Sequence, residues 1–138
     1  MTRTFWTGAL ILALGVAALV LTAPAAHAHH SIAAQFDLDK TVTVTGTITK
    51  MEFRNPHSWL YIDVKDDQGR MQEWAIEFGS VNALFRRGWK REDLPVGAAV
   101  TVNGFAALDG SRTLGATEVA LPDGRRLFAG TAPSEGGR

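Results

Sequence analysis

The sequence predicts an all-β domain with one short helix, arranged as a small five- to six-stranded OB-like Greek-key barrel. Three alternating polar–apolar segments come first, a helical segment follows, and two or three further strand segments complete the chain. This order matches the OB barrel, in which a helix commonly joins the third and fourth strands. A bent first strand also suits barrel closure. A small antiparallel sandwich is the structural alternative.

The first predicted strand, residues 41–53, alternates threonine with valine or isoleucine, and its apolar face runs as far as Ile48. Further on, Met51 and Phe53 carry apolar side chains on the opposite parity. A strand that changes face midway is bent or bulged, and Gly46 permits such a bend.

Residues 58–66 and 70–78 predict the second and third strands, joined by a hairpin turn at 66–69 that ends in glycine. The second strand places aliphatic residues on one face and aromatic residues on the other. A turn at 55–57 precedes it, because the residue before a proline is disfavoured in helical geometry.

The periodicity then changes at residues 80–88, where Ser80 is a typical helix N-cap and Gly88 a typical residue just past the end. Arg86 and Arg87 would lie in the last turn, where they complement the helix dipole; they could also hold an anion. The remaining predicted strands are 94–107, 112–121 and a short one at 125–129.

The first 28 residues have the pattern of a Sec-type secretory signal peptide. Arg3 supplies a positive start, residues 8–21 form an apolar run, and Ala26-His27-Ala28 fits a cleavage site. The run is shorter than the roughly 20 residues a membrane-spanning helix needs. We therefore expect a mature periplasmic chain that starts at His29, with no membrane contact after cleavage. An uncleaved anchor is the alternative.

The sequence divides into a signal peptide, an N-terminal lead, the OB-like domain and a disordered tail, at 1–28, 29–40, 41–130 and 131–138. The chain has no cysteine, so disulfides and thiolate metal sites are excluded. Its 14 basic and 14 acidic residues balance. This balance lacks the basic footprint of a nucleic-acid-binding domain.

Three of the four histidines crowd at the predicted cleavage site. Cleavage after Ala28 would expose the amine of His29 beside its own imidazole, and both can be neutral donors near pH 7. One further imidazole would complete a T-shaped three-nitrogen site, which suits Cu(II). His57 could supply it from the loop between the first two strands. His30 could pair loosely with His29, and a cut after Ala26 would instead create a His-Ala-His chelator.

The second candidate site lies on the polar face of the sheet. Trp59 and Tyr61 share one face of the second strand, and Glu73 and Glu77 occupy the corresponding face of the third. Aromatic rings beside carboxylates suit a sugar or a cation, although these rings could equally pack against the rest of the chain. Asn55, in the preceding turn, completes the set of candidate ligand-binding residues.

The sequence favours a binding protein over an enzyme. Glu73 and Glu77 would lie about 13 Å apart along one strand, whereas glycosidase carboxylates lie roughly 5 to 9.5 Å apart. His57 and Ser58 are neighbours on a strand and point to opposite faces, so they do not form a nucleophile–base pair. The metallopeptidase motif H-E-x-x-H, a P-loop and G-x-S-x-G are all missing.

The chain resembles a family of small exported bacterial proteins that is known as a domain of unknown function. The most specific matching elements are the His-His-Ser start at His29 and the Asn-Pro-His turn at 55–57. Further matching stretches are AHAHHSIAAQFD, VTGTITKMEFRNPHSWLYIDVKD, EWAIEFGSVNALFRRGW and LPDGRRLFAG. The resemblance implies export and a compact β domain, and it implies no activity.

Three functions follow as hypotheses. The first is a periplasmic copper-binding protein that uses His29 and His57, with His30 nearby. The second is a metal-free module whose Trp59 and Tyr61 face binds a saccharide, an envelope component or a partner protein. The third, and weakest, is a hydrolase with a carboxylate centre.

Overall fold

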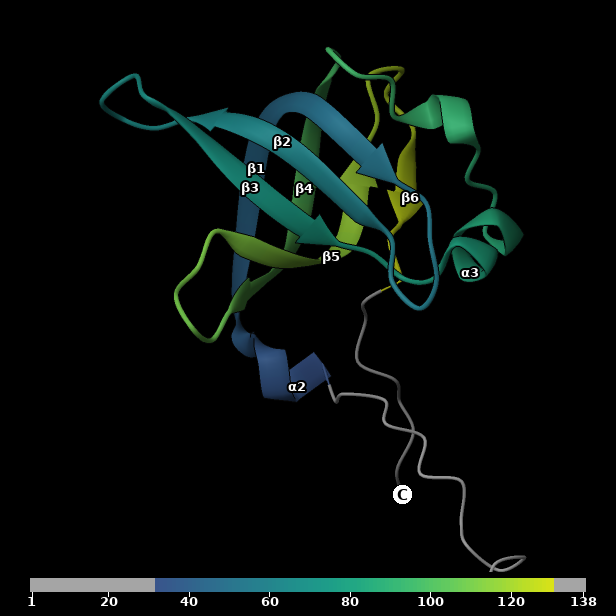
Figure 1. Ribbon diagram of the computed structural model, residues 1–138, viewed down its shortest axis with the longest axis horizontal. Helices are drawn as coiled ribbons and strands as arrows, with labels where there is room; N and C mark the ends of the chain where they lie inside the picture. Colours follow the sequence, from purple (N-terminus) through teal and green to yellow (C-terminus); the bar gives the residue numbers. More distant parts are fainter. Residues whose placement is uncertain (1–31, 131–138) are drawn as a thin grey trace, which may run out of the picture.

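The computed structural model describes residues 32–130, which form a six-stranded sheet that curls into a barrel (Figure 1). The strands are β1 (Phe36–Glu52), β2 (Trp59–Lys65), β3 (Met71–Glu77), β4 (Ala99–Ala107), β5 (Thr113–Ala120) and β6 (Arg126–Phe128). The strand order is β3-β2-β1-β4-β5-β6, and β3 also pairs in parallel with β5. That extra pairing closes the barrel in the predicted OB-like arrangement.

Short helices accompany the strands: α2 (Ile32–Gln35), α3 (Val81–Arg86) and the 3-10 helix η1 (Arg91–Asp93). The sequence predicted α3, and the Ser80 hydroxyl caps it by accepting from the Ala83 amide. It predicted neither α2 nor η1. No helix within residues 32–130 has the length and hydropathy needed to cross a membrane. The predicted signal peptide and tail lie outside the described residues.

Strand β1 begins at Phe36, earlier than the start at residue 41 that alternation predicted. Phe36 and Asp37 pair with the end of β4, and an irregularity between Asp37 and Thr41 separates them from the rest of the ladder. This break interrupts the alternating pattern, which is why the sequence did not reveal the first residues of the strand. Residues 36–40 of the predicted N-terminal lead therefore belong to the barrel.

The change of face along β1 occurs at a bulge between Ile48 and Lys50, and not at Gly46 as predicted. The extra residue, Thr49, shifts the alternation by one, so that Ile48 and Met51 both face the core. Gly46 has a different role, because a Cβ there would lie 2.6 Å from the Asp63 carbonyl oxygen of β2. Only glycine allows the two strands to approach this closely.

The barrel interior is filled by alternate residues from every long strand. Leu60 and Ile62 of β2 and Ile76 of β3 are fully buried there, as the alternation predicted. Leu84 closes the interior from α3, and the Trp89 ring packs against Phe78 at 5.5 Å between centroids. Trp59 and Tyr61 point away from this core, also as predicted.

A buried ion pair fixes η1 to the turn between β5 and β6. The Asp93 side chain is only 2% exposed and accepts from Arg125 Nη2 at 2.5 Å. Its other oxygen accepts from the Lys90 backbone amide at 2.7 Å. Arg125 also pairs with Asp123 at 2.7 Å. These bonds occupy both Asp93 oxygens and hold the segment after α3 against the barrel.

Candidate functional site

The structure brings two of the predicted site residues, His57 and Glu77, into direct contact. His57 Nδ1 lies 2.7 Å from Glu77 Oε1. The side chains differ in exposure: His57 is 48% exposed and Glu77 is 9% exposed. A buried carboxylate thus holds an imidazole whose other edge faces solvent.

The register of the β2–β3 hairpin creates this contact. Trp59 pairs with Glu77 across the two strands, so the residues just before β2 lie beside the end of β3. Buried Ser58 fixes that approach, because its carbonyl accepts from the Phe78 amide and its amide donates to the Gly79 carbonyl. The Ser58 hydroxyl also bonds to the Arg54 backbone, which closes the loop that carries His57.

The N-terminal part of β1 packs against the same outer surface. Glu77 is paired in parallel with Gly115 of β5, so both residues face outward. A Cβ at Gly115 would lie 3.1 Å from the Phe36 ring, and Phe36 is buried although it is not part of the interior cluster. The Phe36 ring therefore lies over Gly115 on the outer surface, adjacent to Glu77 in the register.

Burial raises the pKa of the Glu77 carboxyl, and the nearby His57 imidazole opposes this by favouring the charged form. When the carboxylate accepts from Nδ1–H, a neutral imidazole keeps the Nε2 lone pair free on its exposed edge. Such an imidazole can ligate a metal or accept a proton. Carboxylates commonly orient metal-ligating histidines in this way.

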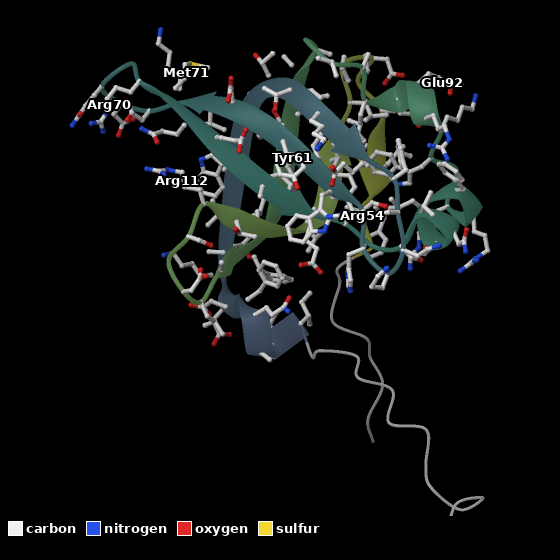
Figure 2. The ribbon with its side chains drawn as sticks, viewed as in Figure 1. Arg54, Tyr61, Arg70, Met71, Glu92 and Arg112 are labelled. Atoms are coloured by element: carbon white, nitrogen blue, oxygen red, sulfur yellow. The ribbon has the colours of Figure 1, made fainter. Side chains whose placement is uncertain are left out.

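The predicted aromatic face is present beside this pair. Trp59 and Tyr61 are both half-buried on the outer side of β2. The Lys50 ammonium lies over the Tyr61 ring at 5.4 Å from its centroid and also pairs with Glu52 at 2.5 Å. Figure 2 shows Tyr61 near the middle of this face. The Tyr61 ring thus already has a cationic neighbour.

The other predicted residues are not gathered at this site. Glu73 is exposed and pairs across the sheet with Asp63, away from Glu77. Asn55 is exposed in the loop and precedes a cis proline. His29 and His30 lie outside the described residues, and within residues 32–130 no group of three or more His, Cys, Asp or Glu side chains could hold a metal ion.

The sequence reasoning selected His57 and Glu77 for different sites and missed their contact. Nor did it reveal the roles of Ser58, which fixes the loop that carries His57, and of Phe36, which lies over Gly115, the parallel partner of Glu77. A signal came close to the contact: the predicted 66–69 turn pairs residue 65 with residue 70 and so places residue 59 opposite residue 76. The observed register differs by one residue, because Lys65 pairs with Met71 and Trp59 with Glu77. Nothing comparable was available for Phe36, because its contact joins two distant segments.

A family model described as "Family of unknown function (DUF6152)" matches residues 17–116. No curated protein and no solved structure matches the chain. The family match covers well over half of the sequence, so the chain belongs to this family. Membership in a family of unknown function was predicted and is confirmed, whereas the His-His-Ser start and export remain predictions.

Proposed function

We propose that this chain, a member of the DUF6152 family of unknown function, is an exported periplasmic copper-binding protein. The ligands are the His29 amine and imidazole together with His57 Nε2, and His30 lies close by. The role is the binding or delivery of Cu(II) and not catalysis. The observation that carries the proposal is the His57–Glu77 pair on the outer surface against which the start of β1 packs.

Chain connectivity supports a joint site. Phe36 anchors the start of β1 next to Glu77 on the outer surface, and α2 begins only four residues before it, at Ile32. The three steps from Ile32 back to His29 span about 10 Å when extended. An N-terminal ligand on so short a tether starts from the part of β1 that packs beside the partner of Glu77.

The chemistry of the donors favours copper. Nitrogen ligands bind Cu(II) more tightly than the other divalent first-row metals, and a three-nitrogen T-shape is compatible with its tetragonal preference. The Glu77 carboxylate fixes the His57 ring and makes Nε2 a better donor. Glu77 itself is not a metal ligand; it acts by positioning His57.

The test starts with the first residue of the exported protein, measured by mass spectrometry after purification from the periplasm. We expect His29. Copper titration, followed by visible absorption and electron paramagnetic resonance, should then show one tight site with three nitrogen ligands. A matched chain with one extra glycine before His29 should lose most of this affinity, because the amine would no longer adjoin the imidazole.

His57→Ala separates the joint site from a terminus that binds copper alone. Removing a ligand should weaken affinity by more than the roughly 10- to 100-fold that outer partners contribute. Lys65→Ala, an exposed change on the same strand, is the control and should have no effect. A mature start at Ser31 or later, or unchanged affinity in His57→Ala, rejects the proposal.

The second candidate is a metal-free module that uses the Trp59 and Tyr61 face. The observation that favours it is the partial exposure of both rings on one side of β2. This function predicts that an envelope saccharide quenches or enhances the tryptophan fluorescence. The change should be lost in Trp59→Ala and retained in His57→Ala. The copper proposal predicts the opposite dependence on these two variants.

A further inference from the structure

A second surface, which includes none of the proposed metal ligands, combines arginines with exposed phenylalanines. It is formed by the loop after β1, by α3 and η1, and by β6, and Figure 1 shows α3 and β6 on the same side of the barrel. We call it the arginine–phenylalanine surface; its members are Phe53, Phe85, Arg86, Arg87, Lys90, Arg91 and Phe128.

Stacking contacts hold this surface together. The Arg91 guanidinium lies 5.4 Å from the centroids of both Phe53 and Phe85, whose rings are 5.5 Å apart. The Arg87 guanidinium lies 4.6 Å from the Phe128 ring centroid. Phe85 and Phe128 nevertheless remain 38% and 40% exposed. The rings are therefore available to a partner as well as to the arginines.

The cations of this surface have no acidic partner among the described residues. Arg70 and Arg125 elsewhere on the barrel pair with carboxylates, and so does Arg126 of β6, which pairs with Glu118. Within residues 32–130, by contrast, no ion pair involves the four cations of the surface: Arg86, Arg87, Lys90 and Arg91. Residues 79–91 contain no aspartate or glutamate, and Glu92 is the first acidic residue that follows. The neutral composition of the whole chain conceals this local excess of positive charge.

We propose that the arginine–phenylalanine surface binds the headgroup layer of a bilayer that contains anionic phospholipid. A guanidinium stacked on a ring keeps its N–H edge free for bidentate bonds to phosphate. Exposed phenylalanines flanked by arginines suit the boundary between headgroups and acyl chains. A free phosphate ion would gain nothing from these rings, so the combination favours a lipid surface.

This proposal revises one expectation from the sequence. The absence of membrane contact after export was inferred because no second apolar span follows residue 28. Attachment to a headgroup layer requires no span, only charge and a few shallowly inserted rings. The proposal is independent of copper and stands or fails separately from it.

The test is co-sedimentation of the purified full chain with vesicles of phosphatidylglycerol and phosphatidylcholine, against vesicles of phosphatidylcholine alone. Each cation near an anionic surface contributes roughly a fivefold gain in partitioning. Arg86→Gln/Arg87→Gln/Arg91→Gln should therefore lower binding about a hundredfold. Any contribution from the N-terminal segment is common to all variants and cancels in the comparison.

The matched control, Lys65→Gln/Arg70→Gln/Arg112→Gln, removes the same charge around the β2–β3 turn and the start of β5, where Figure 2 shows Arg70 and Arg112. It should retain nearly all binding. Phe85→Ser/Phe128→Ser keeps the charge and should also weaken binding. Equal losses in both triple variants, equal binding to neutral vesicles, or complete competition by millimolar inorganic phosphate would each overturn the proposal. Circular dichroism checks that every variant is folded.

Discussion

Glu77 and Asp93 are carboxylates of similar burial that have different surroundings. Asp93 binds a backbone amide and Arg125, a permanent cation that closes two loops together. Glu77 binds His57, whose side chain is 48% exposed. The Asp93 pair therefore joins two loops and has a structural role. The Glu77 pair leaves the second ring nitrogen of His57, Nε2, available to a ligand at the surface, as expected of a functional group.

Breaking the structural tie should have the largest effect. Asp93→Ala removes the acceptor for the Lys90 amide and leaves Arg125 with Asp123 alone, so the free energy of unfolding should fall by about 3 kcal/mol. Urea denaturation measures the loss. Copper affinity of the folded variant should be unchanged, and a weakened metal site would show that the two regions are coupled.

Disturbing the other pair should affect binding more than folding. Glu77→Gln keeps the size of the side chain but removes its charge, so copper affinity should fall about 10- to 100-fold while the barrel stays folded. Isothermal titration calorimetry at pH 7 is the measurement. Glu73→Gln, four residues earlier on the exposed side of β3, is the matched control. Equal affinities for Glu77→Gln and Glu73→Gln would remove Glu77 from the proposed site.

The segment between the two carboxylates allows a milder test of their independence. Ser80→Ala deletes the N-cap of α3, which follows Glu77 and precedes Asp93, and should cost about 1 kcal/mol of stability. Thermal unfolding gives the size of the effect. Because the cap touches neither pair, Ser80→Ala and Asp93→Ala should be additive within about 0.5 kcal/mol. A larger discrepancy would indicate that α3 transmits strain between them.

The pH dependence of stability distinguishes the pairs most finely. Burial raises the pKa of Glu77 in the folded protein, so the folded state holds a proton that the unfolded state has lost. This contribution is complete below the unfolded pKa near 4.5 and disappears as pH rises through the higher folded pKa. The stability of Glu77→Gln relative to the unmodified chain should therefore rise over that interval in urea titrations. A flat difference would contradict the assigned burial.

Local pattern was sufficient to predict most of the fold. Alternation located β2 and β3 closely, and the Ser80 cap located α3, because these signals depend on neighbouring residues. The start of β1 was missed because the irregularity after Asp37 interrupts alternation. Closure by β3–β5 pairing was implied only by the order of the elements, since no short-range feature of Gly115 or Glu77 reveals it.

The site was predicted less well than the fold, for a related reason. His57 and Glu77 were each selected from their residue type and their position on a strand. Their contact depends on hairpin register, and tertiary packing brings Phe36 over Gly115, the parallel partner of Glu77. The balanced charge of the whole chain also hid the cations after Phe85, which have no acidic partner within residues 32–130. Composition reports totals, whereas both surfaces depend on where charge is placed.

The packing of Phe36 on Gly115 has a consequence for the order of events in folding. These residues come from opposite ends of the domain, and their encounter requires pairings of high contact order, which are generally late events in folding. Until then the proposed site has only the two nitrogens of His29, because His57 is not yet held near the start of β1. Three-nitrogen copper binding would thus require the completed barrel, so that it would indicate a folded molecule.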